Sequence, residues 1–482
     1  MNIFDIPLDI LKEIFEFCDF ITKIRFRQIC KYSYKNLHII DFYNIEQKYL
    51  EKLTEDILKN YEFIRYLNAK NNPKIIDVSW MKNLKELDAN ENCGINQNGI
   101  NGLNLIKLNV NENSKINNVN WMSSLKELYA NGNCGINQIG INALNLIKLA
   151  ADNNPKIKNV SFMTCLKELY ANENCGIDQI GIKGLNLIKL DAWNNMKIKN
   201  VNFMPNLKEL DASEKSGIDQ TGIKGLDLIK LDAYDNPNIK DVNWMINLKE
   251  LDASRTCGID QNGIKGLDLI KLEVDDNDKI KDVNWMINLK ELDAGEYSGI
   301  DQSGIKELNL IKLDVWDNDK ITDVSFMRSL KELCFSEECS IDQNGIKGLD
   351  LFKLDVNFNH KINDVSFMTN LKELYAEGNC GIDQNGIKGL NLIKLNLYDN
   401  FKITDVSFMT KLKELNISGE SGINQSGING LDLTKLFVYN NSKIKNVSWM
   451  TNLKELHADG NCGIDKSGID GLDLTKLNGI II

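Results

Sequence analysis

The stretch LKELDANENCGINQNGINGLNLIKLNVNENSKINNVNWMSS, residues 84–124, decides the fold, because most of the chain repeats it. Its opening tetrad LKEL returns every 41 residues without insertion or deletion. A fixed period of this length predicts a solenoid, in which each unit buries its apolar face only against its neighbours. The tetrads begin at Leu84, Leu125, Leu166, Leu207, Leu248, Leu289, Leu330, Leu371, Leu412 and Leu453.

Each 41-residue block contains two coils of similar sequence. The long coil has 21 residues and begins at Leu84, and the short coil has 20 residues and begins at Leu105. In both, the pattern L-x-x-L-x-A/V precedes an Asn and further apolar positions. This pattern resembles the leucine-rich repeat, whose coils contain about 20–29 residues. The resemblance covers residues 64–482 and implies an α/β leucine-rich-repeat solenoid of about twenty coils of 20–21 residues, with a parallel concave sheet.

The start of each coil has the alternation expected of a short strand. Leu87 and Ala89 alternate with the polar residues Glu86 and Asp88, so that one face of the strand is buried. Successive coils then stack their strands in parallel, about 4.8 Å apart. The third strand position alternates between Glu in long coils and Lys in short coils, for example Lys107. Neighbouring strands are therefore predicted to place opposite charges side by side.

The composition restricts the compartment and the partners. The chain has 482 residues, with 57 basic and 68 acidic side chains and a net charge of −11. This balance argues against nucleic acid or an anionic membrane as the main partner. No apolar run approaches the roughly 20 residues that a membrane span needs, and the N-terminus lacks the basic region of a secretory signal. We therefore expect the protein in the cytoplasm or, alternatively, in the nucleus.

Residues 1–40 differ in kind from the repeats. They lack the 41-residue period, and their apolar residues from Ile10 to Phe17 follow a helical spacing. A second apolar pattern around Ile29 and Cys30 is flanked by basic residues. The sequence therefore predicts a small helical module in front of the solenoid.

This module resembles the F-box, which docks a substrate receptor onto Skp1 of a cullin-based ubiquitin ligase. The resemblance rests on Ile6-Pro7, on the run ILKEIF from Ile10 to Phe15, and on the triplet ICK that begins at Ile29. Ile stands in place of the usual Leu before the Pro, and the usual late Trp is missing. The resemblance implies a Skp1-binding surface formed by Pro7, Leu8, Ile10, Leu11, Ile14, Phe15, Ile29 and Cys30.

A simpler interpretation is that residues 1–60 only cap the repeats, because the first coil of a solenoid needs a cover. A pure cap, however, has no reason to leave apolar residues exposed for a partner. Residues 41–63 are predicted to form a connecting helix that does the capping. The chain then divides into an F-box module at residues 1–40, this linker at 41–63 and the solenoid at 64–482.

The sequence contains no recognisable catalytic or metal-binding constellation. Most of its cysteines share one register of the long coil, where successive members lie two coils, about 10 Å, apart. A disulfide needs Cα atoms within about 7 Å, so these thiols are predicted to be buried singly. The three histidines fit no metal or triad pattern. We therefore expect a protein that is not an enzyme and has no cofactor and no metal. The cysteines in this register are Cys93, Cys134, Cys175, Cys257, Cys339, Cys380 and Cys462.

Two other features that recur in register are predicted to be structural. Short coils hold an unbroken row of asparagines from Asn72 to Asn441, whose amides can bond to backbone groups of neighbouring coils. Pairs such as Trp80-Met81 are predicted to pack beneath the outer side of the coil. Long coils lose their own Asn in five copies, which predicts looser turns there. The replacements are Lys215, Thr256, Tyr297, Glu338 and Glu420.

Exposed positions that vary between copies are the candidates for target binding. The fifth and seventh positions of the short coil carry acids and aromatic residues between about residues 190 and 440. Trp and Tyr on a concave sheet suit a protein-binding surface, because such residues dominate binding hot spots. Neutral drift among duplicated copies is the alternative. The candidate residues are Asp191, Trp193, Asp232, Tyr234, Asp314, Trp316, Tyr398 and Tyr439.

Together with the F-box resemblance, these features predict a substrate-recognition adaptor of a Skp1–cullin–F-box ubiquitin ligase. Its N-terminal helices would bind a Skp1-like protein, and its concave face would bind an unidentified target protein. The regular, Asn-rich copies look most similar to those of F-box/leucine-rich-repeat proteins of giant DNA viruses of amoebae. The alternative is a leucine-rich-repeat scaffold or decoy with no ligase link. A catalytic Cys domain, as in bacterial proteins that join one to such repeats, is not expected, since the repeats run to residue 482.

Overall fold

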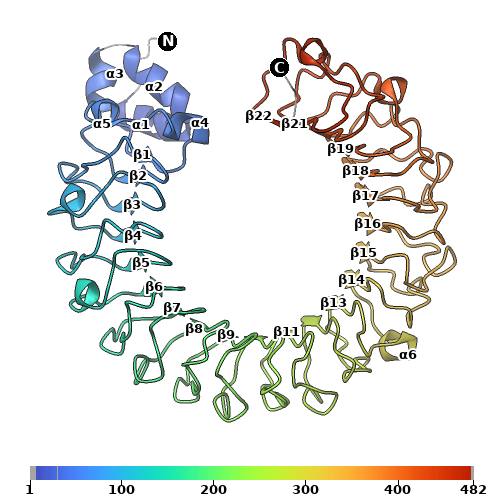
Figure 1. The fold of residues 1–482 in the computed structure, drawn as a ribbon, viewed down its shortest axis with the longest axis horizontal. Coiled ribbons are helices and arrows are strands. Elements are labelled where there is room, and N and C mark those ends of the chain that lie inside the picture. Colours follow the sequence, from blue (N-terminus) through green and yellow to red (C-terminus); the bar gives the residue numbers. More distant parts are fainter. Residues whose placement is uncertain (1–6, 30, 479–482) are drawn as a thin grey trace. The chain divides into compact units, whose positions relative to one another are not determined.

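The computed structural model describes residues 7–29 and 31–478. It divides the chain into two compact units, Met1–Leu228 (unit 1) and Ile229–Ile482 (unit 2). In both units each coil contributes one short strand, and each strand pairs in parallel with the strand of the next coil (Figure 1). The solenoid with a parallel sheet that the 41-residue period predicts is therefore confirmed.

Unit 1 begins with short helices and continues as coils. Each of its strands pairs with the next in the order of the chain. The helices are α1 (Leu8–Phe17), α2 (Phe20–Gln28), α3 (Lys31–Asn36), α4 (Gln47–Leu50) and α5 (Glu55–Leu58), with 3-10 turns at Asn98–Ile100 and Ile139–Ile141. The strands are β1 (Asp41–Phe42), β2 (Tyr66–Asn68), β3 (Glu86–Asp88), β4 (Lys107–Asn109), β5 (Glu127–Tyr129), β6 (Lys148–Ala150), β7 (Glu168–Tyr170), β8 (Lys189–Asp191) and β9 (Glu209–Asp211).

Unit 2 consists of coils built on the same plan, again with strands paired in chain order. Its strands are β10 (Lys230–Asp232), β11 (Glu250–Asp252), β12 (Lys271–Glu273), β13 (Glu291–Asp293), β14 (Lys312–Asp314), β15 (Glu332–Cys334), β16 (Lys353–Asp355), β17 (Glu373–Tyr375), β18 (Lys394–Asn396), β19 (Glu414–Asn416), β20 (Lys435–Phe437), β21 (Glu455–His457) and β22 (Lys476–Asn478). Helix α6 (Gln302–Ile305) and 3-10 turns at Gln425–Ile428 and Lys466–Ile469 follow three of them.

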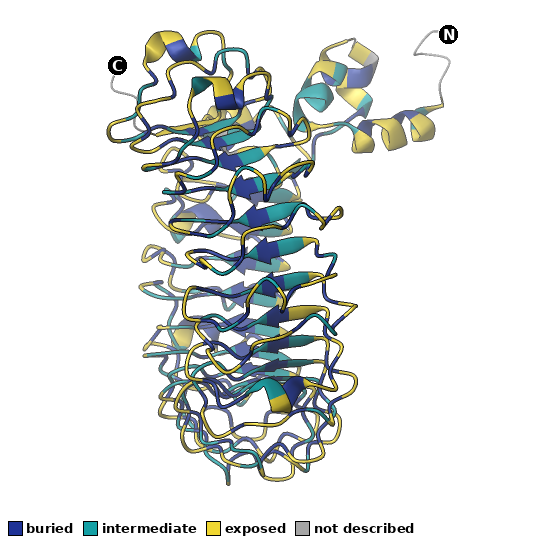
Figure 2. Ribbon diagram, turned by 90° about the vertical axis from the view of Figure 1, so that its right-hand side faces the viewer, coloured by how far each residue is buried: buried dark blue, intermediate teal, exposed yellow. Residues whose placement is uncertain are grey.

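Strands β2 to β21 bury their central residue and leave at least one flanking residue accessible, as the alternation in the sequence predicts, whereas β22 is exposed throughout. Leu108 in β4 is fully buried between Lys107 and Asn109, which are not. Figure 2 shows this change from buried to half-buried along the strands. The third, fifth and seventh positions of the coils thus share one accessible surface, which we call the strand face.

The asparagine row of the short coils is buried and fully bonded, as predicted. The side-chain amide of Asn113 donates to the carbonyls of Ala89 (2.7 Å) and Ile95 (3.2 Å) of the preceding coil. Its Oδ1 accepts the N–H of Lys115 at 3.0 Å. One residue therefore satisfies three backbone groups that would otherwise be buried without a partner.

A second amide row, of glutamines in the long coils, was not predicted from the sequence. The Oε1 of Gln97 accepts the N–H groups of Asn117 (2.9 Å) and Asn118 (3.0 Å) in the next coil. Its Nε2 donates to the carbonyl of Asn118 at 2.9 Å. The fixed spacing of Gln in the CGIxQ motif was the available signal, and its meaning depends on the contact between coils.

The aromatic-Met pairs are only partly core. Met122 is fully buried, but Trp121 keeps 39% of its surface exposed and donates from its ring nitrogen to the carbonyl of Leu103 at 2.9 Å. Phe162, in the next block, is 37% exposed. The prediction that both members pack beneath the coil is therefore wrong for the aromatic ring, which lies across the outer surface.

Helices α1 to α3 form a small module with its own packing. Leu11 and Phe15 of α1 are each only 2% exposed, and the ring of Phe15 lies edge-on to that of Phe26 in α2, with centroids 6.2 Å apart. Asp19 caps α2 by accepting the N–H of Thr22 at 2.8 Å. Short amphipathic helices are marginal alone, so this shared core is what holds the module together.

Residues 41–63 contact the first coil, but they do not form the one connecting helix that was predicted to cap it. They contain strand β1 and the one-turn helices α4 and α5. Thr54 is the N-cap of α5. Glu55 accepts the N–H groups of Ile76 (2.7 Å) and Asp77 (2.8 Å), which is the task that Gln97 performs inside the array. The cap thus imitates a coil, and a strand does this better than a helix because β1 can pair with β2.

Candidate functional site

Ion pairs run along the strand face at the third position, as predicted. Lys148 lies 2.9 Å from Glu168, and Lys230 lies 3.0 Å from Glu250. These side chains are roughly a quarter to a half exposed, and exposed pairs of this kind contribute about 0–1 kcal/mol each. The ladder supports the register of the coils but carries no specificity, because it is the same in most copies.

The predicted target-binding residues lie on the strand face but do not form one cluster. Trp193 belongs to unit 1, whereas the other predicted aromatic residues belong to unit 2. Tyr234 and Trp316 follow strands β10 and β14, four strand spacings apart, which is roughly 19 Å. Tyr439 is 44% exposed, and the others are half-buried. The structure therefore places accessible aromatic rings along the face, separated by other coils.

The predicted acids Asp191, Asp232 and Asp314 have a structural role that the sequence did not reveal. Each accepts the backbone N–H of the aromatic residue two positions later. The distances are 3.4 Å to Trp193, 3.0 Å to Tyr234 and 3.1 Å to Trp316. A short side chain that bonds the backbone two residues on stabilises a turn. These carboxylates therefore fix the chain beside the aromatic ring and remain accessible at the same time.

In unit 2 the fifth position forms an unbroken carboxylate row over five strands, β10 to β14. Paired in register are Asp232 with Asp252, Glu273 with both Asp252 and Asp293, and Asp293 with Asp314. Burial, followed by the charges of Asp314 and other neighbouring acids, raises the pKa of Asp293 to about 7. Burial raises the pKa of Asp252 to about 6. This row is therefore acidic yet partly protonated near neutral pH.

In unit 1 the same position carries aromatic residues that the sequence analysis missed. Tyr129 and Tyr170 stand on β5 and β7, and Lys148 on β6 lies between them. The Lys148 ammonium is 5.8 Å from the centroid of the Tyr129 ring and 5.0 Å from that of Tyr170. Such cation–π contacts contribute about 0.5–1 kcal/mol at accessible sites. These tyrosines occupy the fifth position of long coils, whereas the candidate list was drawn from short coils only.

The turn at residues 336–340 departs from those of its neighbours. In the adjacent copies, Gly299 and Gly381 donate their N–H groups to an asparagine carbonyl of the preceding coil, at 2.9 and 2.8 Å. A Cβ at either glycine would lie 2.3–2.6 Å from backbone carbonyl oxygens, which is closer than atoms approach. The equivalent residue in this turn is Ser340. Its Cβ excludes the close approach, so this turn cannot follow the path of its neighbours.

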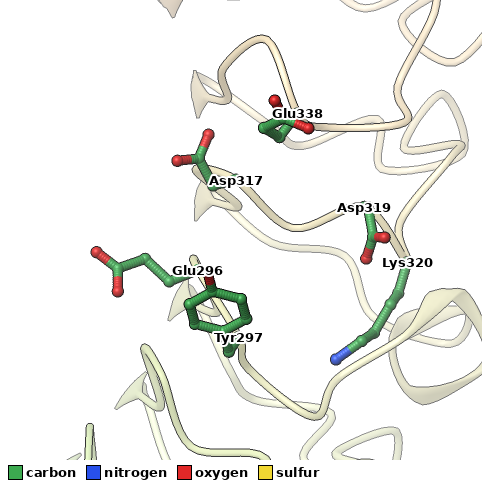
Figure 3. Close-up of a pocket in the computed structure, with 6 residues that line it drawn as sticks. All are labelled: Glu296, Tyr297, Asp317, Asp319, Lys320 and Glu338. Carbon is green, nitrogen blue, oxygen red and sulfur yellow. The ribbon is translucent and has the colours of Figure 1, made fainter.

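An acidic hollow of about 570 Å³ lies beside this turn (Figure 3). The amide of Asn359 now bonds to the carbonyl of Ser336 (2.8 Å), one residue beyond the regular partner. Lys320 at the edge of the hollow donates to the carbonyl of Ser298 at 2.6 Å. The hollow is lined by Glu296, Tyr297, Asp317, Asp319, Lys320 and Glu338.

The other copies that lack the turn asparagine stay regular. Residues beside Lys215, Thr256 and Glu420 keep the left-handed conformation of the standard turn, with φ of 53° at Glu214 and 58° at Arg255. The predicted loosening therefore does not follow from the missing Asn. The irregular turn at residues 336–340 is explained instead by Ser340, which stands where the neighbouring copies have glycine.

The register cysteines are buried and unpaired, as predicted, except that Cys462 in the last block is half-buried. Burial raises the pKa of Cys93 to about 11 and that of Cys175 to about 12. A thiol with such a pKa holds almost no thiolate at neutral pH and is a poor nucleophile. Among residues 7–29 and 31–478, no three His, Cys, Asp or Glu side chains group in a way that could hold a metal ion.

Helix α1 presents an apolar face that the described part of the chain does not cover. Ile10, Ile14 and Phe17 lie at helical spacing and are 43%, 42% and 93% exposed. They form one stripe, beside the face of the helix that Leu11 and Phe15 anchor in the module core. A solvent-exposed Phe next to two Ile costs free energy in an isolated chain, and such patches mark docking surfaces.

Comparison with known families identifies this module. Residues 3–42 match the model of the F-box domain. The chain carries an F-box. Comparison with curated proteins finds no match over the chain.

Solved structures resemble the solenoid in fold alone. TLR13, in a complex with ssRNA13, is 17% identical, with 90% of this chain and 82% of that chain covered and a TM-score of 0.50. The mouse RP105/MD-1 complex is 14% identical, with 88% of this chain and 72% of that chain covered and a TM-score of 0.39. The leucine-rich-repeat protein LIC12759 of Leptospira interrogans is 16% identical, with 86% of this chain and 95% of that chain covered and a TM-score of 0.31.

The predicted Skp1-binding residues differ in how far they are exposed. Pro7, Ile10, Ile14 and Ile29 are exposed, and Leu8 is half-buried. Leu11 and Phe15 are buried in the module core, so the structure corrects their assignment from partner contact to internal packing. Cys30 lies outside the described residues. Phe17, the most exposed apolar residue of α1, was missed although its helical spacing with Ile10 was visible.

Proposed function

We propose that this protein is the substrate-recognition adaptor of a Skp1–cullin–F-box ubiquitin ligase. The proposal is supported by an F-box followed by a leucine-rich-repeat solenoid. In this arrangement the F-box binds a Skp1-like protein and the strand face holds a target, so that the target has a high effective concentration beside the ligase. The protein does no chemistry itself, and it acts in the cytosol or the nucleus. No helix in the described part of the chain has the length and apolar character needed to cross a membrane.

The observation that carries the proposal is the uncovered stripe of Ile10, Ile14 and Phe17. The contacts to the first coil that support capping come from residues 41–63, through β1, through the Leu50 carbonyl that accepts from Asn72, and through Glu55. The helical module is therefore not used up by capping. A module that has its own core and keeps an apolar stripe in solvent fits a docking element better than a cover.

Target recognition on the strand face is supported by its accessible aromatic rings and its acids. Trp and Tyr provide large contact area at low entropic cost. The carboxylate row of unit 2 repels phosphates, so we propose a protein target, although TLR13 binds ssRNA13 in its own structure. The predicted residues Trp193, Tyr234, Trp316, Tyr398 and Tyr439 remain the candidate contacts.

Binding of recombinant Skp1 to the full chain tests the first half of the proposal. The double variant Ile14→Ala with Phe17→Ala should bind at least about tenfold more weakly, since buried aromatic anchors carry most of an interface's free energy. The matched control is Lys12→Ala with Glu13→Ala, two exposed polar residues of the same helix, which should bind normally. No binding of Skp1 by the unaltered chain would leave a scaffold or decoy as the function.

Capture of target proteins from a lysate tests the second half. We expect Trp193→Ala with Trp316→Ala to reduce capture while the chain stays folded, because both rings are half-exposed. The melting temperature and the binding of Skp1 serve as controls in the same samples. If the double variant precipitates instead, these rings belong to the core and the proposed contacts are wrong.

A further inference from the structure

Among residues 7–29 and 31–478, no carboxylate pairs with the buried arginine of the F-box module. Arg27, in the last turn of α2, is only 8% exposed. Its guanidinium lies 4.7 Å from the centroid of the Tyr34 ring and 5.1 Å from that of Tyr61. Its Nε has no hydrogen-bond partner, and its Nη2 makes only one long contact, 3.5 Å to the carbonyl of Tyr34. Buried charges are ordinarily paired, because desolvation costs several kcal/mol.

Arg27 borders a pocket of about 360 Å³ between α3 and the segment that follows α5. This volume lies at the lower end of the roughly 300–1,000 Å³ of small-molecule sites. Two of its walls are aromatic, namely Tyr34 and Phe63. The lining residues are Arg27, Lys31, Tyr34, Lys35, His38, Asn60, Glu62 and Phe63.

The pocket is cationic. Lys31 and Lys35 are four residues apart on α3, so both extend from the same side of the helix. With Arg27 they place three positive charges around the pocket against a single carboxylate, that of Glu62. His38 adds no charge at neutral pH, because burial and then the charge of Arg27 lower its pKa. The excess of about two positive charges matches a dianion.

We propose that this pocket binds a phosphate dianion, either free inorganic phosphate or the phosphoryl group of a small phosphomonoester. Arginine and lysine together are the usual donors to phosphate oxygens, the first through a planar fork and the second as a point charge. Tyr34 and Phe63 line the mouth and can pack against the organic part of an ester. The two tyrosine rings beside Arg27 keep its guanidinium in place whether or not the anion is bound.

Calorimetric titration of the full chain tests this site, with inorganic phosphate and phenyl phosphate as the two probes. We expect saturable binding of at least one probe, and tighter binding of phenyl phosphate if the site takes an ester. The variant Lys31→Ala with Lys35→Ala should weaken that binding about tenfold or more. Both lysines are exposed, so this variant should keep its fold.

The matched control removes two lysines elsewhere. Lys265→Ala with Lys306→Ala alters the net charge equally, at exposed residues of unit 2, and should bind the probe normally. Arg27→Lys, which keeps the charge but loses the fork, should show an intermediate loss. The proposal is overturned if neither probe binds saturably, or if the two lysine pairs weaken binding equally.

Discussion

The strand faces of the two units are built on the same frame and differ at one position. In both units the third position alternates Glu and Lys and the fourth is a buried Leu. At the fifth position, strands β5 and β7 of unit 1 carry Tyr129 and Tyr170 on either side of Lys148, whereas strands β10 to β14 of unit 2 each carry a carboxylate. Unit 1 has a shorter run of acids on β8 and β9, and unit 2 has one tyrosine at this position, Tyr375 on β17. Near-identical coils thus present two chemically distinct surfaces.

The difference shows which positions the fold controls. A buried residue contacts both neighbouring coils, so any change at that position disturbs two interfaces. A fifth-position side chain is only half-buried and tolerates both Tyr and Asp. Its identity is therefore available for recognition, but like charges in register still cost free energy. Unit 2 should accordingly be the more sensitive to pH.

The largest expected effect tests whether the frame is truly common to both units. Asn113→Ala in unit 1 and Asn277→Ala in unit 2 each remove two bonds to buried carbonyls, at 2.7 and 3.2 Å and at 2.6 and 3.2 Å. We expect each to lower the free energy of unfolding by about 3 kcal/mol, as measured by urea denaturation. Clearly unequal costs would show that the two units do not share one frame.

Glycine at the turn should have the next largest effect. Gly176→Ser in unit 1 and Gly381→Ser in unit 2 would each place a Cβ 2.3–2.6 Å from backbone carbonyl oxygens. We expect each to cost about 2 kcal/mol and to increase hydrogen exchange at the altered turn. The control is Ser340→Ala, which keeps the Cβ and should change little. If Gly381→Ser left the free energy of unfolding unchanged, our explanation of the irregular turn would be wrong.

The carboxylate row should make unit 2 less stable as the pH rises. The folded-state pKa of Asp293 is about 7, above its ordinary 3.8. The folded chain therefore binds more protons than the unfolded chain within this window, and the free energy of unfolding falls as the pH increases through it. Asp293→Asn with Asp314→Asn should stabilise the protein by roughly 2 kcal/mol at pH 8, after allowance for partial exposure, and by little at pH 4.

Hydrogen exchange of peptides from each unit, at several pH values, measures that effect locally. Asp301→Ala is the control in the same unit, because bonds from Ser303 lower the pKa of its carboxyl. Asp301→Ala should lower the free energy of unfolding at neutral pH, whereas the Asn variants should raise it. Equal pH dependence in both units would remove the distinction between the two strand faces.

The smallest effects concern a cation–π contact of unit 1 and an ion pair of unit 2. Tyr170→Leu removes the ring that lies 5.0 Å from the Lys148 ammonium and should cost about 0.5–1 kcal/mol. Lys230→Ala in unit 2 removes only an exposed ion pair with Glu250 and should cost less than about 0.5 kcal/mol. Thermal melting of the two variants gives the comparison, and the reverse order would show that charge outweighs the aromatic contact.

Much of the repeat fold could be predicted because its sequence pattern recurs at a fixed period. Leu108 and Asn113 have the same surroundings in every block, so a pattern seen ten times identifies a buried position. The candidate site was less predictable. Phe17 and Leu11 are both apolar residues of one helix, and only the packing of α2 on α1 shows which is covered.

The sequence by itself determined the solenoid, its short parallel strands, its asparagine row and the resemblance of its first residues to an F-box. These follow from local alternation and from neighbours that are copies of one another. Only the tertiary structure decided the strand-like cap, the irregular turn at Ser340, the pairing of acids along the strand face and the uncovered stripe of α1. The cap, the irregular turn and the stripe of α1 depend on how unlike segments pack, about which a repeating pattern holds no information. The pairing of acids depends on the residues that vary between copies, which only the strand register brings side by side.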